Sequence, residues 1–436
     1  MKEILKKIAD CTPYSVGRLL NKIPMSLRLG QDYTAFKEKS CEAISTDTNR
    51  LQYSKIKALL EHSVQNTIFY EKFYSKHDFD LNKINSFDDI SKIPIVQKID
   101  FQEYPLEHRS IASLALKKSN TGGTTGQPLN FYLEKNAYAR EWAHMHTIWA
   151  KLGYRHTDEK ITIRGKNIGK NYFKYNVNQN EFLINAYSPL IENIHACRVL
   201  ILKRNIQWIH GYPSSITSFL KELESSDPIL FEIFIRKIKG VFLGSEYPAP
   251  QYRSYIEGHC GLRTISWYGH SEMAVLAPEL EPGSGEYFPF QSYGFAEAVA
   301  SENSYRLIAT STHNLATPFI RYDTGDLIQP TFKNGLLESF SIKEGRNGEC
   351  VTDLKGRSIS LTGLIFGRHH KAFDYCEHVQ VRQIAPGKIE ILISSKNPRP
   401  DWAKLFDFTN SFFDIQYTQI NSPIRTPLGK VQLLLR

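Results

Sequence analysis

The sequence predicts an α/β protein with a large N-terminal domain of mixed sheets and helices and a small α+β C-terminal domain. Strand-like apolar segments alternate with helical stretches along most of the chain, a pattern typical of partly parallel sheets. The length of 436 residues suits two or three domains. The chain changes character after Gly345, so we expect residues 1–345 and residues 346–436 to form the two domains.

The spacing of apolar residues locates the individual elements. The expected helices cover residues 51–75, 134–152, 191–204, 214–225 and 250–258. The expected strands cover residues 129–133, 161–163, 208–209, 240–243 and 306–310, and in the small domain residues 379–383 and 388–393. Several of the helices separate consecutive strands, which supports the α/β assignment.

The formal net charge of +9 favours an anionic partner such as a nucleotide, a sugar nucleotide or an anionic membrane surface. A basic solvated surface explains the charge equally well. No nucleic-acid partner is expected, because the sequence contains no recognisable nucleic-acid-binding module.

The sequence has no signal peptide and no apolar run near the roughly 20 residues that span a bilayer. We therefore expect a cytoplasmic protein without a transmembrane segment. Residues 1–30 are basic and mildly amphipathic. A helix docked on the body of the protein is the favoured interpretation, and a peripheral membrane contact is the alternative. The six cysteines are scattered without a C-x-x-C pair, so we interpret them as reduced thiols.

The segment Ser119-Asn120-Thr121-Gly122-Gly123-Thr124-Thr125-Gly126 has the composition of a phosphate-binding loop. Glycine lets the backbone approach phosphate oxygens closely, while N–H groups and threonine hydroxyls donate hydrogen bonds. The loop is not a Walker loop, because Gln127-Pro128 follows where Lys-Ser/Thr would stand, and it does not match G-x-G-x-x-G. A flexible surface turn remains the alternative for this segment alone.

Three further segments place groups suited to nucleotide chemistry at strand ends or turns. Tyr268 and Glu272 lie four residues apart beside a glycine; such a ring can stack on a base and such a carboxylate can bind Mg²⁺. Asp326 ends the turn 321–326, where a carboxylate can accept both ribose hydroxyls. Lys430 lies on a tight turn in the last ten residues. Singly, each segment is also explained as an ordinary strand end or charged turn.

In this order and spacing the segments resemble the adenylate-forming superfamily, more closely its phenylacetate–CoA ligase-like branch, and within it the CapK-type proteins of bacterial capsule and O-antigen synthesis. The resemblance runs from about residue 85 to the C-terminus and is specific as a set. The motifs that carry it are the loop 119–126, His210-Gly211-Tyr212-Pro213-Ser214, Leu243-Gly244-Ser245-Glu246, Tyr268-Gly269-His270-Ser271-Glu272, Arg321-Tyr322-Asp323-Thr324-Gly325-Asp326 and Gly429-Lys430.

The resemblance implies a role for each matching residue. The phosphates of ATP would be bound by Ser119, Thr121, Gly122, Gly123, Thr124, Thr125 and Gly126. The rest of the nucleotide and its Mg²⁺ would be bound by Ser245, Glu246, Tyr268, Gly269, Ser271, Glu272 and Asp326. The carboxylate substrate would be bordered by Tyr212, His270 and Arg321. Lys430, Glu272 and Arg346 would be the catalytic residues, with Arg346 at the hinge of a mobile C-terminal domain.

The sequence departs from the family pattern in three places. Asn347-Gly348-Glu349 follows Gly345-Arg346 where relatives carry an acidic hinge residue, so Glu349 is a candidate replacement. Residues 353–360 match the CapK-type pattern better than that of phenylacetate ligases, which puts CoA in doubt as the acceptor. Some relatives bind zinc through a Cys/His cluster; here only His259 and Cys260 lie close together, and zinc is not expected.

The resemblance predicts an ATP- and Mg²⁺-dependent ligase that adenylates a small-molecule or sugar-nucleotide carboxylate. The acyl group would pass to an amine or thiol acceptor, giving an amide in surface polysaccharide synthesis. An acyl-CoA ligase is one alternative, and the basic run 368–371 could then contact CoA phosphates, although a solvated face explains it equally well. A non-catalytic nucleotide-binding scaffold is another alternative. The sequence does not indicate the oligomeric state.

Overall fold

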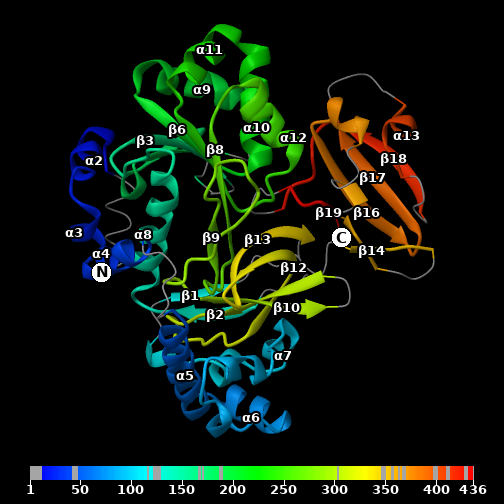
Figure 1. Cartoon of the computed structure of the whole chain (residues 1–436). Coiled ribbons are helices and arrows are strands. Elements are labelled where there is room, and N and C mark those ends of the chain that lie inside the picture. The colour runs from blue at the N-terminus through cyan, green and yellow to red at the C-terminus, as the bar shows by residue number, and fades with distance from the viewer. Residues whose placement is uncertain are drawn as a thin grey trace. The chain divides into compact units, whose positions relative to one another are not determined.

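The chain forms two compact units, each assembled from segments far apart in sequence. Unit 1 comprises Met1–Pro24, Trp149–Ser266 and Glu349–Arg436, and unit 2 comprises Met25–Ile148 and Trp267–Gly348. The computed structural model describes residues 12–41, 48–114, 117–120, 129–164, 168, 171–185, 190–301, 304–344, 350–354, 358–361, 364–365, 370–395, 401–408, 413–426 and 431–435. The predicted mixed α/β class is confirmed (Figure 1).

The first part of unit 1 is a mainly parallel sheet. Its strands, in spatial order, are β4 (Phe173–Asn176), β5 (Glu181–Ile184), β3 (Glu159–Ile163), β6 (Ile206–Gly211), β7 (Gly240–Leu243) and β8 (Thr264–Gly269). Only β4 runs antiparallel to its neighbour among these strands. The crossover helices are α9 (Leu190–Lys203), α10 (Pro213–Ser226), α11 (Pro228–Lys237) and α12 (Pro250–Arg253) with its π-helical continuation Ser254–His259.

Helices α9, α10 and α11 cover one face of this sheet (Figure 1). Inward residues such as Ile161 and Val241 of the strands and Phe219 of α10 share one buried apolar core. Proline opens both α10 and α11, where its missing N–H costs no helical hydrogen bond. Asp227 caps α11 by accepting a 3.0 Å hydrogen bond from the Leu230 N–H. Local sequence and burial therefore agree on these helices.

The C-terminal segment of unit 1 has its own sheet and core. Its elements are β14 (Cys350–Thr352), β15 (Ser358–Ser360), a 3₁₀ turn (Lys371–Asp374), β16 (His378–Ala385), β17 (Lys388–Ser394), α13 (Trp402–Leu405), β18 (Asp414–Ile420) and β19 (Leu434–Leu435). The four-stranded sheet has the order β18-β17-β16-β19. β16 and β17 contain the two strands expected here. The domain boundary at 345–346 lies outside the described residues and stays a prediction.

Unit 2 consists of helical segments and antiparallel strands. Its helices are α3 (Met25–Leu29), α4 (Gln31–Lys39), α5 (Thr48–Asn66), α6 (Ile68–Lys76), α7 (Lys98–Gln102) and α8 (Ala137–Ala150), the last of which ends in unit 1. Its sheets are the pair β1 (Lys117–Asn120) and β2 (Asn130–Leu133), and the meander β10 (Phe295–Ser301), β11 (Ser304–Thr310), β12 (Tyr322–Lys333) and β13 (Leu336–Glu344). The end of β8 pairs with β9 (Leu276–Pro278).

The helix expected over residues 51–75 is in fact two helices. Thr67 separates α5 from α6 with an extended backbone, and its hydroxyl accepts a 3.3 Å hydrogen bond from the Tyr70 N–H. Threonine is a favoured N-cap, so the second helix starts afresh there. Apolar spacing continues across the break, which is why periodicity alone predicted one helix.

Candidate active site

Strained backbone marks three of the predicted motifs. The non-glycine residues with positive φ are Asp78, Asn180, Ser245, Met273, Arg321 and Asn334. Asn and Asp adopt this conformation readily, whereas other side chains rarely do. The remaining three lie within or directly beside predicted site motifs, with φ of 66° at Ser245, 55° at Met273 and 43° at Arg321. Because such strain concentrates at functional sites, it supports the motif assignment.

Two tyrosine hydroxyls join two predicted motifs, 268–272 and 321–326, inside unit 2. The Tyr268 hydroxyl, at the end of β8, donates to Asp326 Oδ2 of β12 at 2.5 Å. The Tyr322 hydroxyl donates to Glu272 Oε1 at 3.3 Å. The ring of Tyr268 packs edge-to-face on Phe340, with 5.3 Å between centroids, which fixes its orientation. The structure therefore pairs the base-stacking candidate with the ribose candidate, and the Mg²⁺ candidate with Tyr322 of the same strand β12.

His270 presents a buried nitrogen beside this group. Its Nδ1 lies 3.1 Å from Glu272 Oε2, and both side chains are buried. Its Nε2 is buried and has no hydrogen-bond partner among the described residues. A buried ring nitrogen without a partner is costly unless a ligand or water supplies one. This geometry supports the prediction that His270 borders the carboxylate pocket.

The guanidinium of Arg321 is occupied by protein groups. Its Nε donates to Glu297 at 3.1 Å, and its Nη1 donates to the carbonyls of Ser91 and Ile93 at 2.6 Å each. Burial raises the pKa of Glu297, and the positive charge of Arg321 opposes that shift. These partners argue against direct substrate contact by Arg321 and favour a role in positioning the turn that leads to Asp326.

The two ends of the predicted phosphate loop are held together by a strand pair. Ser119 pairs with Phe131 and Asn120 with Asn130 across β1 and β2. The Tyr132 N–H donates to Thr317 Oγ1 at 2.8 Å, which ties β2 to the segment before Arg321. Thr121, Gly122, Gly123, Thr124, Thr125 and Gly126 lie outside the described residues, as do Arg346 and Lys430, so their roles stay predictions.

Glu246, in unit 1, is fastened to two other segments of that unit. Its Oε2 accepts from the hydroxyl of Ser214 at 2.7 Å, at the start of α10. Its Oε1 accepts from the backbone N–H of Val431 at 2.9 Å. Burial raises the pKa of this carboxyl, and the hydrogen bonds from Ser214 and Val431 oppose the shift. Glu246 therefore holds the chain next to the predicted catalytic Lys430.

Two further contacts join the same parts of unit 1. The Arg425 Nη1 donates to Ser215 Oγ at 3.1 Å. His378 lies between Ser218 Oγ and the Tyr252 hydroxyl, 3.0 Å from each. Burial lowers the pKa of His378 to about 3, so the ring is neutral at pH 7. Neighbouring Tyr212 is buried at the start of α10, and its N–H donates to Ile163 of β3.

The structure adds detail to the metal and CoA expectations. His259 Nε2 lies 2.7 Å from Glu224 and its ring stacks on Tyr255, while Cys260 is a buried thiol. Across the described residues no three His, Cys, Asp or Glu side chains form a metal-binding group. In the basic run 368–371, His370 is buried and accepts from the Asp407 N–H, so it does not face solvent phosphate. Within the same described part, no helix is long and apolar enough to cross a membrane.

Sequence reasoning missed Tyr322 as a site residue, although it lies within a quoted motif. It also missed Ser214 and Val431, which hold Glu246, because Val431 is 185 residues away along the chain. No sequence motif indicated the group of Arg140, Glu141 and Tyr293 in unit 2. Arg140 and Tyr293 are buried, and the Tyr293 hydroxyl donates to Glu141. Only their unusual pairing in three dimensions distinguishes these residues from ordinary helix and loop positions.

The comparisons with known proteins agree with the geometry. The sequence is 22% identical over 369 residues to Protein CapK of Staphylococcus aureus, which covers 80% of this chain and 79% of that protein. No protein-family model matches the sequence. The structure is similar to 2-hydroxyisobutyryl-CoA ligase in its post-adenylation state with R3-HIB-AMP, at a TM-score of 0.66 and 14% identity over 89% of each chain.

A second structural neighbour is the GH3.15 acyl acid amido synthetase, at a TM-score of 0.59 and 14% identity over 86% of this chain and 87% of that one. The chain is thus a distant homologue of CapK and has the fold of adenylate-forming enzymes. One neighbour is a CoA ligase and the other an amido synthetase, so the fold is compatible with either acceptor.

Proposed function

We propose that this protein is a cytoplasmic, ATP-dependent ligase that adenylates a carboxylic acid and transfers the acyl group to an amine in surface polysaccharide synthesis. The observation that carries the proposal is the two hydrogen-bonded pairs Tyr268–Asp326 and Tyr322–Glu272. Two of the sequence motifs that the adenylation reaction would need meet there. The distant homology to CapK supports the polysaccharide role, and the amido synthetase neighbour supports an amine acceptor.

In the proposed reaction a carboxylate oxygen attacks the α-phosphorus of ATP and pyrophosphate leaves, giving an acyl-adenylate. Negative charge grows on the phosphoryl oxygens, so fixed donors and cations lower the barrier. Lys430 would stabilise that charge, and Asp326 would accept the ribose hydroxyls. Glu272, a buried carboxylate near Tyr322, fits an Mg²⁺ ion, which would screen the phosphates when bound.

Glu246 would position Lys430 rather than touch adenine. Both of its oxygens accept hydrogen bonds from protein donors, and one of these donors is the N–H of Val431. Ser245 would provide the strained turn that aims Glu246 at Val431. The direct nucleotide contact that the family resemblance implies for Ser245 and Glu246, which would line the adenine site, stays a prediction beside this one.

The test is ATP–pyrophosphate exchange with the purified chain and a panel of aromatic acids, short fatty acids, amino acids and UDP-hexuronic acids. Exchange that depends on one class of acid supports adenylation and names the substrate class. Exchange with none of the acids would favour the nucleotide-binding scaffold.

An acyl-CoA ligase is the second candidate, favoured by the similarity to 2-hydroxyisobutyryl-CoA ligase. The two candidates differ in what consumes the acyl-adenylate. With the acid found by exchange, release of AMP should accelerate on adding amino sugars if the acceptor is an amine, and on adding CoA if it is a thiol. Acceleration by CoA alone would overturn the amide proposal and leave adenylation standing.

A membrane contact is the proposed partner of the N-terminal helix α2 (Tyr14–Leu20). Gly17 faces the body of unit 1 so closely that a Cβ there would lie 2.5 Å from Tyr175. The helix is therefore docked, as the sequence favoured. The opposite side leaves Val16, Leu19, Leu20 and Ile23 exposed, with Leu19 65% exposed.

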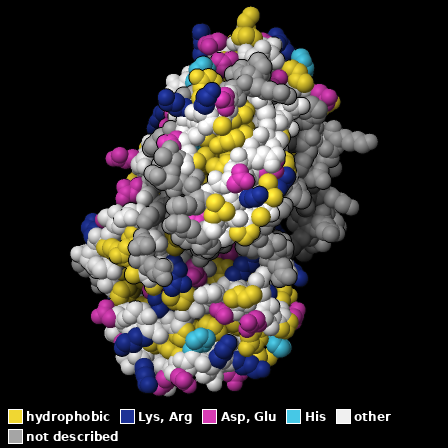
Figure 2. Space-filling view, turned by 90° about the vertical axis from the view of Figure 1, so that its right-hand side faces the viewer, with side chains coloured by type: hydrophobic (Ala, Val, Ile, Leu, Met, Phe, Trp, Pro, Cys, Tyr) yellow, Lys and Arg dark blue, Asp and Glu magenta, His cyan; other side chains and the backbone are white. Residues whose placement is uncertain are grey.

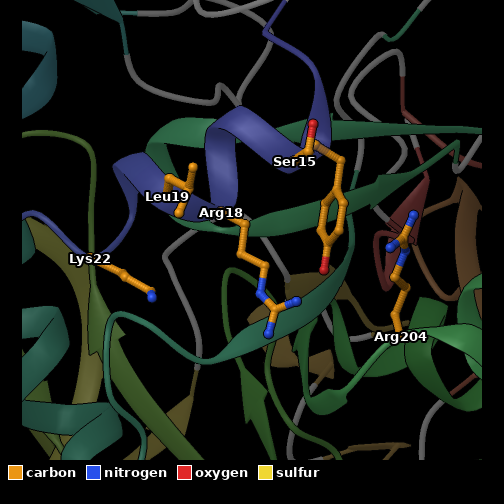
Figure 3. A pocket seen from close by; sticks show the side chains of 6 residues that line it. Ser15, Arg18, Leu19, Lys22 and Arg204 are labelled. Carbon is orange, nitrogen blue, oxygen red and sulfur yellow. The ribbon is translucent and has the colours of Figure 1, made fainter.

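Cations line the pocket beside these apolar side chains. Arg18 and Lys22 extend from α2 and the turn after it, and Arg204 from the end of α9 (Figure 3). The Arg204 guanidinium stacks on the Tyr14 ring at 3.9 Å. On the face drawn in Figure 2, by contrast, basic and acidic side chains of the described residues are interspersed. Apolar side chains beside grouped cations fit an anionic lipid surface.

Cosedimentation with vesicles tests this partner. Phosphatidylglycerol vesicles should bind the protein, and Arg18→Gln/Lys22→Gln should weaken binding about thirtyfold, since each cation near such a surface contributes about 1 kcal/mol. The matched control Arg236→Gln/Lys239→Gln removes two exposed cations of the same unit and should bind as the parent does. Equal binding to phosphatidylcholine vesicles, or an equal loss in the control, would rule out the proposed contact.

A further inference from the structure

Arg140, in the first turn of α8, is a fully buried arginine with no hydrogen-bond partner among the described residues. Its side chain is 0% exposed, and its Nε, Nη1 and Nη2 are all buried and unpaired among the described residues. Burial lowers the pKa of this guanidinium, yet arginine keeps its proton in proteins. A buried charge without a partner is among the most costly arrangements in a folded protein.

The acidic side chain next to Arg140 in the sequence is hydrogen-bonded to another residue. Glu141 is the next residue, but its Oε2 accepts a 2.6 Å hydrogen bond from the Tyr293 hydroxyl. Burial raises the pKa of Glu141 more than Tyr293 and Arg140 lower it. The guanidinium lies instead over the Tyr293 ring, 5.1 Å from its centroid. One face of the guanidinium thus has an aromatic support, while its donors have no acceptor.

Two neutral histidines lie within electrostatic range of Arg140. Phe36 contacts both the His144 and the His313 rings, at centroid distances of 6.1 and 5.2 Å. Burial, with the charge of Arg140, lowers the pKa of His144 to about 4 and that of His313 to about 3. His144 Nε2 is paired with Ser292, whereas His313 Nε2 is buried without a partner. An anion here would meet the Arg140 fork and a second donor.

Tyr293 and Glu141 connect Arg140 to the neighbourhood of the candidate active site. Tyr293 contacts Arg140 with its ring and Glu141 with its hydroxyl. The carboxyl of Glu141 interacts electrostatically with His270, which lies 3.1 Å from Glu272. All of these residues belong to unit 2. Arg140 and the predicted carboxylate site at His270 therefore belong to one neighbourhood of unit 2.

We propose that Arg140 binds a second anionic group of the acid that this protein adenylates. The substrate class is then a short dianionic acid, either a dicarboxylic acid or a carboxylic acid with a phosphate ester. A guanidinium can pair with either a carboxylate or a phosphate through two parallel N–H···O bonds. The Tyr293 ring, which lies against the guanidinium, fixes its orientation. The proposal rests on the adenylation function proposed above, and it explains why a buried charge is retained whose donors have no acceptor among the described residues.

Matched acids test the substrate class in the exchange assay. Succinate is paired with butyrate, glutarate with pentanoate, and 3-phosphopropionate with propionate, so each pair differs only in the distal anion. The parent protein should prefer the dianion of at least one pair by about a hundredfold in kcat/KM. Arg140→Met should remove that preference and Arg140→Lys should keep part of it. Equal use of both acids in every pair by the parent protein would overturn the proposal.

The stability of the ligand-free protein gives a second readout that does not need exchange activity. Arg109 is the matched control: it is also buried in unit 2, but its guanidinium donates to the carbonyls of Tyr104 and Asn130. Arg140→Met should raise Tm by a few degrees, because an unpaired charge is removed, whereas Arg109→Met should lower it. Sulfate raises the Tm of any folded protein by exclusion from its surface, so the readout is the excess: the Tm of the parent and of Arg109→Met should rise by more than that of Arg140→Met.

A Tm that falls in Arg140→Met as it does in Arg109→Met would show that Arg140 has a structural partner, and would overturn the proposal. Exchange with no acid at all would defeat the adenylation function; the sulfate and Tm results would then still show whether Arg140 binds an anion. The two failures are therefore distinguishable.

Discussion

Glu272 and Glu246 are two carboxylates that the sequence motifs assign to the same nucleotide site, yet the structure surrounds them differently. Glu272 lies within unit 2, where Tyr322 and His270 contact it. Glu246 lies within unit 1 and joins α10 to the last residues of the chain through Ser214 and Val431. The first belongs to a group assembled by neighbouring motifs. Glu246 accepts a hydrogen bond from Val431, 185 residues away along the chain, so it can hold the segment next to the predicted catalytic Lys430.

The largest effect expected from this comparison is that of Lys430→Ala. Removing the ammonium should lower ATP–pyrophosphate exchange at least about a hundredfold, because a fixed cation at the developing phosphoryl charge is lost. Lys404→Ala removes an exposed lysine of the same C-terminal segment and should leave exchange unchanged. If Lys430→Ala kept nearly the parental rate of exchange, Lys430 would not be needed for adenylation. Glu246 would then have no catalytic residue to position.

Glu272→Gln should have the next largest effect. The amide keeps the shape but loses the charge that would hold Mg²⁺, so exchange should fall about thirtyfold, or about 2 kcal/mol, and more Mg²⁺ should be needed for half-maximal rate. Glu338→Gln, which changes a surface partner of Lys333, is the control. An unchanged Mg²⁺ dependence would argue against the metal role.

Glu246→Gln should lower exchange about tenfold by weakening the charge-assisted bonds to Ser214 and Val431. Hydrogen exchange should also become faster at residues 431–435, which a role in adenine binding would not produce. Glu257→Gln is a control within unit 1. If the amides of residues 431–435 exchanged at the parental rate in Glu246→Gln, the proposal that Glu246 holds this segment would be contradicted.

The same variant gives a pH prediction. Burial raises the pKa of Glu246 in the folded state above its unfolded value, so the folded state takes up this proton at a higher pH. Lowering the pH through the raised pKa therefore favours folding at this carboxyl. The Tm of the parent minus that of Glu246→Gln should rise between pH 7.5 and pH 5, and a constant difference would contradict the raised pKa.

The smallest effect expected is that of Tyr322→Phe, which removes one 3.3 Å hydrogen bond to Glu272. Stability should fall by about 1 kcal/mol, measured by urea unfolding. Tyr305→Phe, in the neighbouring strand β11, is the control. If stability stays constant while the Mg²⁺ requirement rises, Tyr322 acts on the metal site rather than on the fold.

The sequence allowed prediction of those parts of the site that are carried by local motifs. Motif residues and the family resemblance singled out Tyr268, Glu272 and Asp326, and the structure pairs Tyr268 with Asp326 and Glu272 with Tyr322; their roles in nucleotide binding stay predictions. The partners of Glu246 could not be predicted, because long-range register decides which backbone N–H meets a given carboxylate. Arg140 was also invisible: helical spacing places it on a buried face, but no pattern shows that its donors lack acceptors.

The fold was predictable for a similar reason. Strands β3, β7 and β11 contain the expected apolar runs, since burial on both faces leaves a continuous signal. The division between α5 and α6 could not be predicted, because a single N-cap at Thr67 starts a new helix although the apolar spacing continues. The grouping of residues 149–266 with 349–436 in one unit rests on contacts between distant segments, which sequence spacing does not record.

The three strained positions 245, 273 and 321 have a consequence for protein engineering. A left-handed backbone there excludes β-branched residues and tolerates glycine or asparagine. A library that randomises the neighbouring site residues to change substrate range should hold these three positions fixed. Otherwise most of its members will lose activity through backbone conformation before any new specificity can be selected.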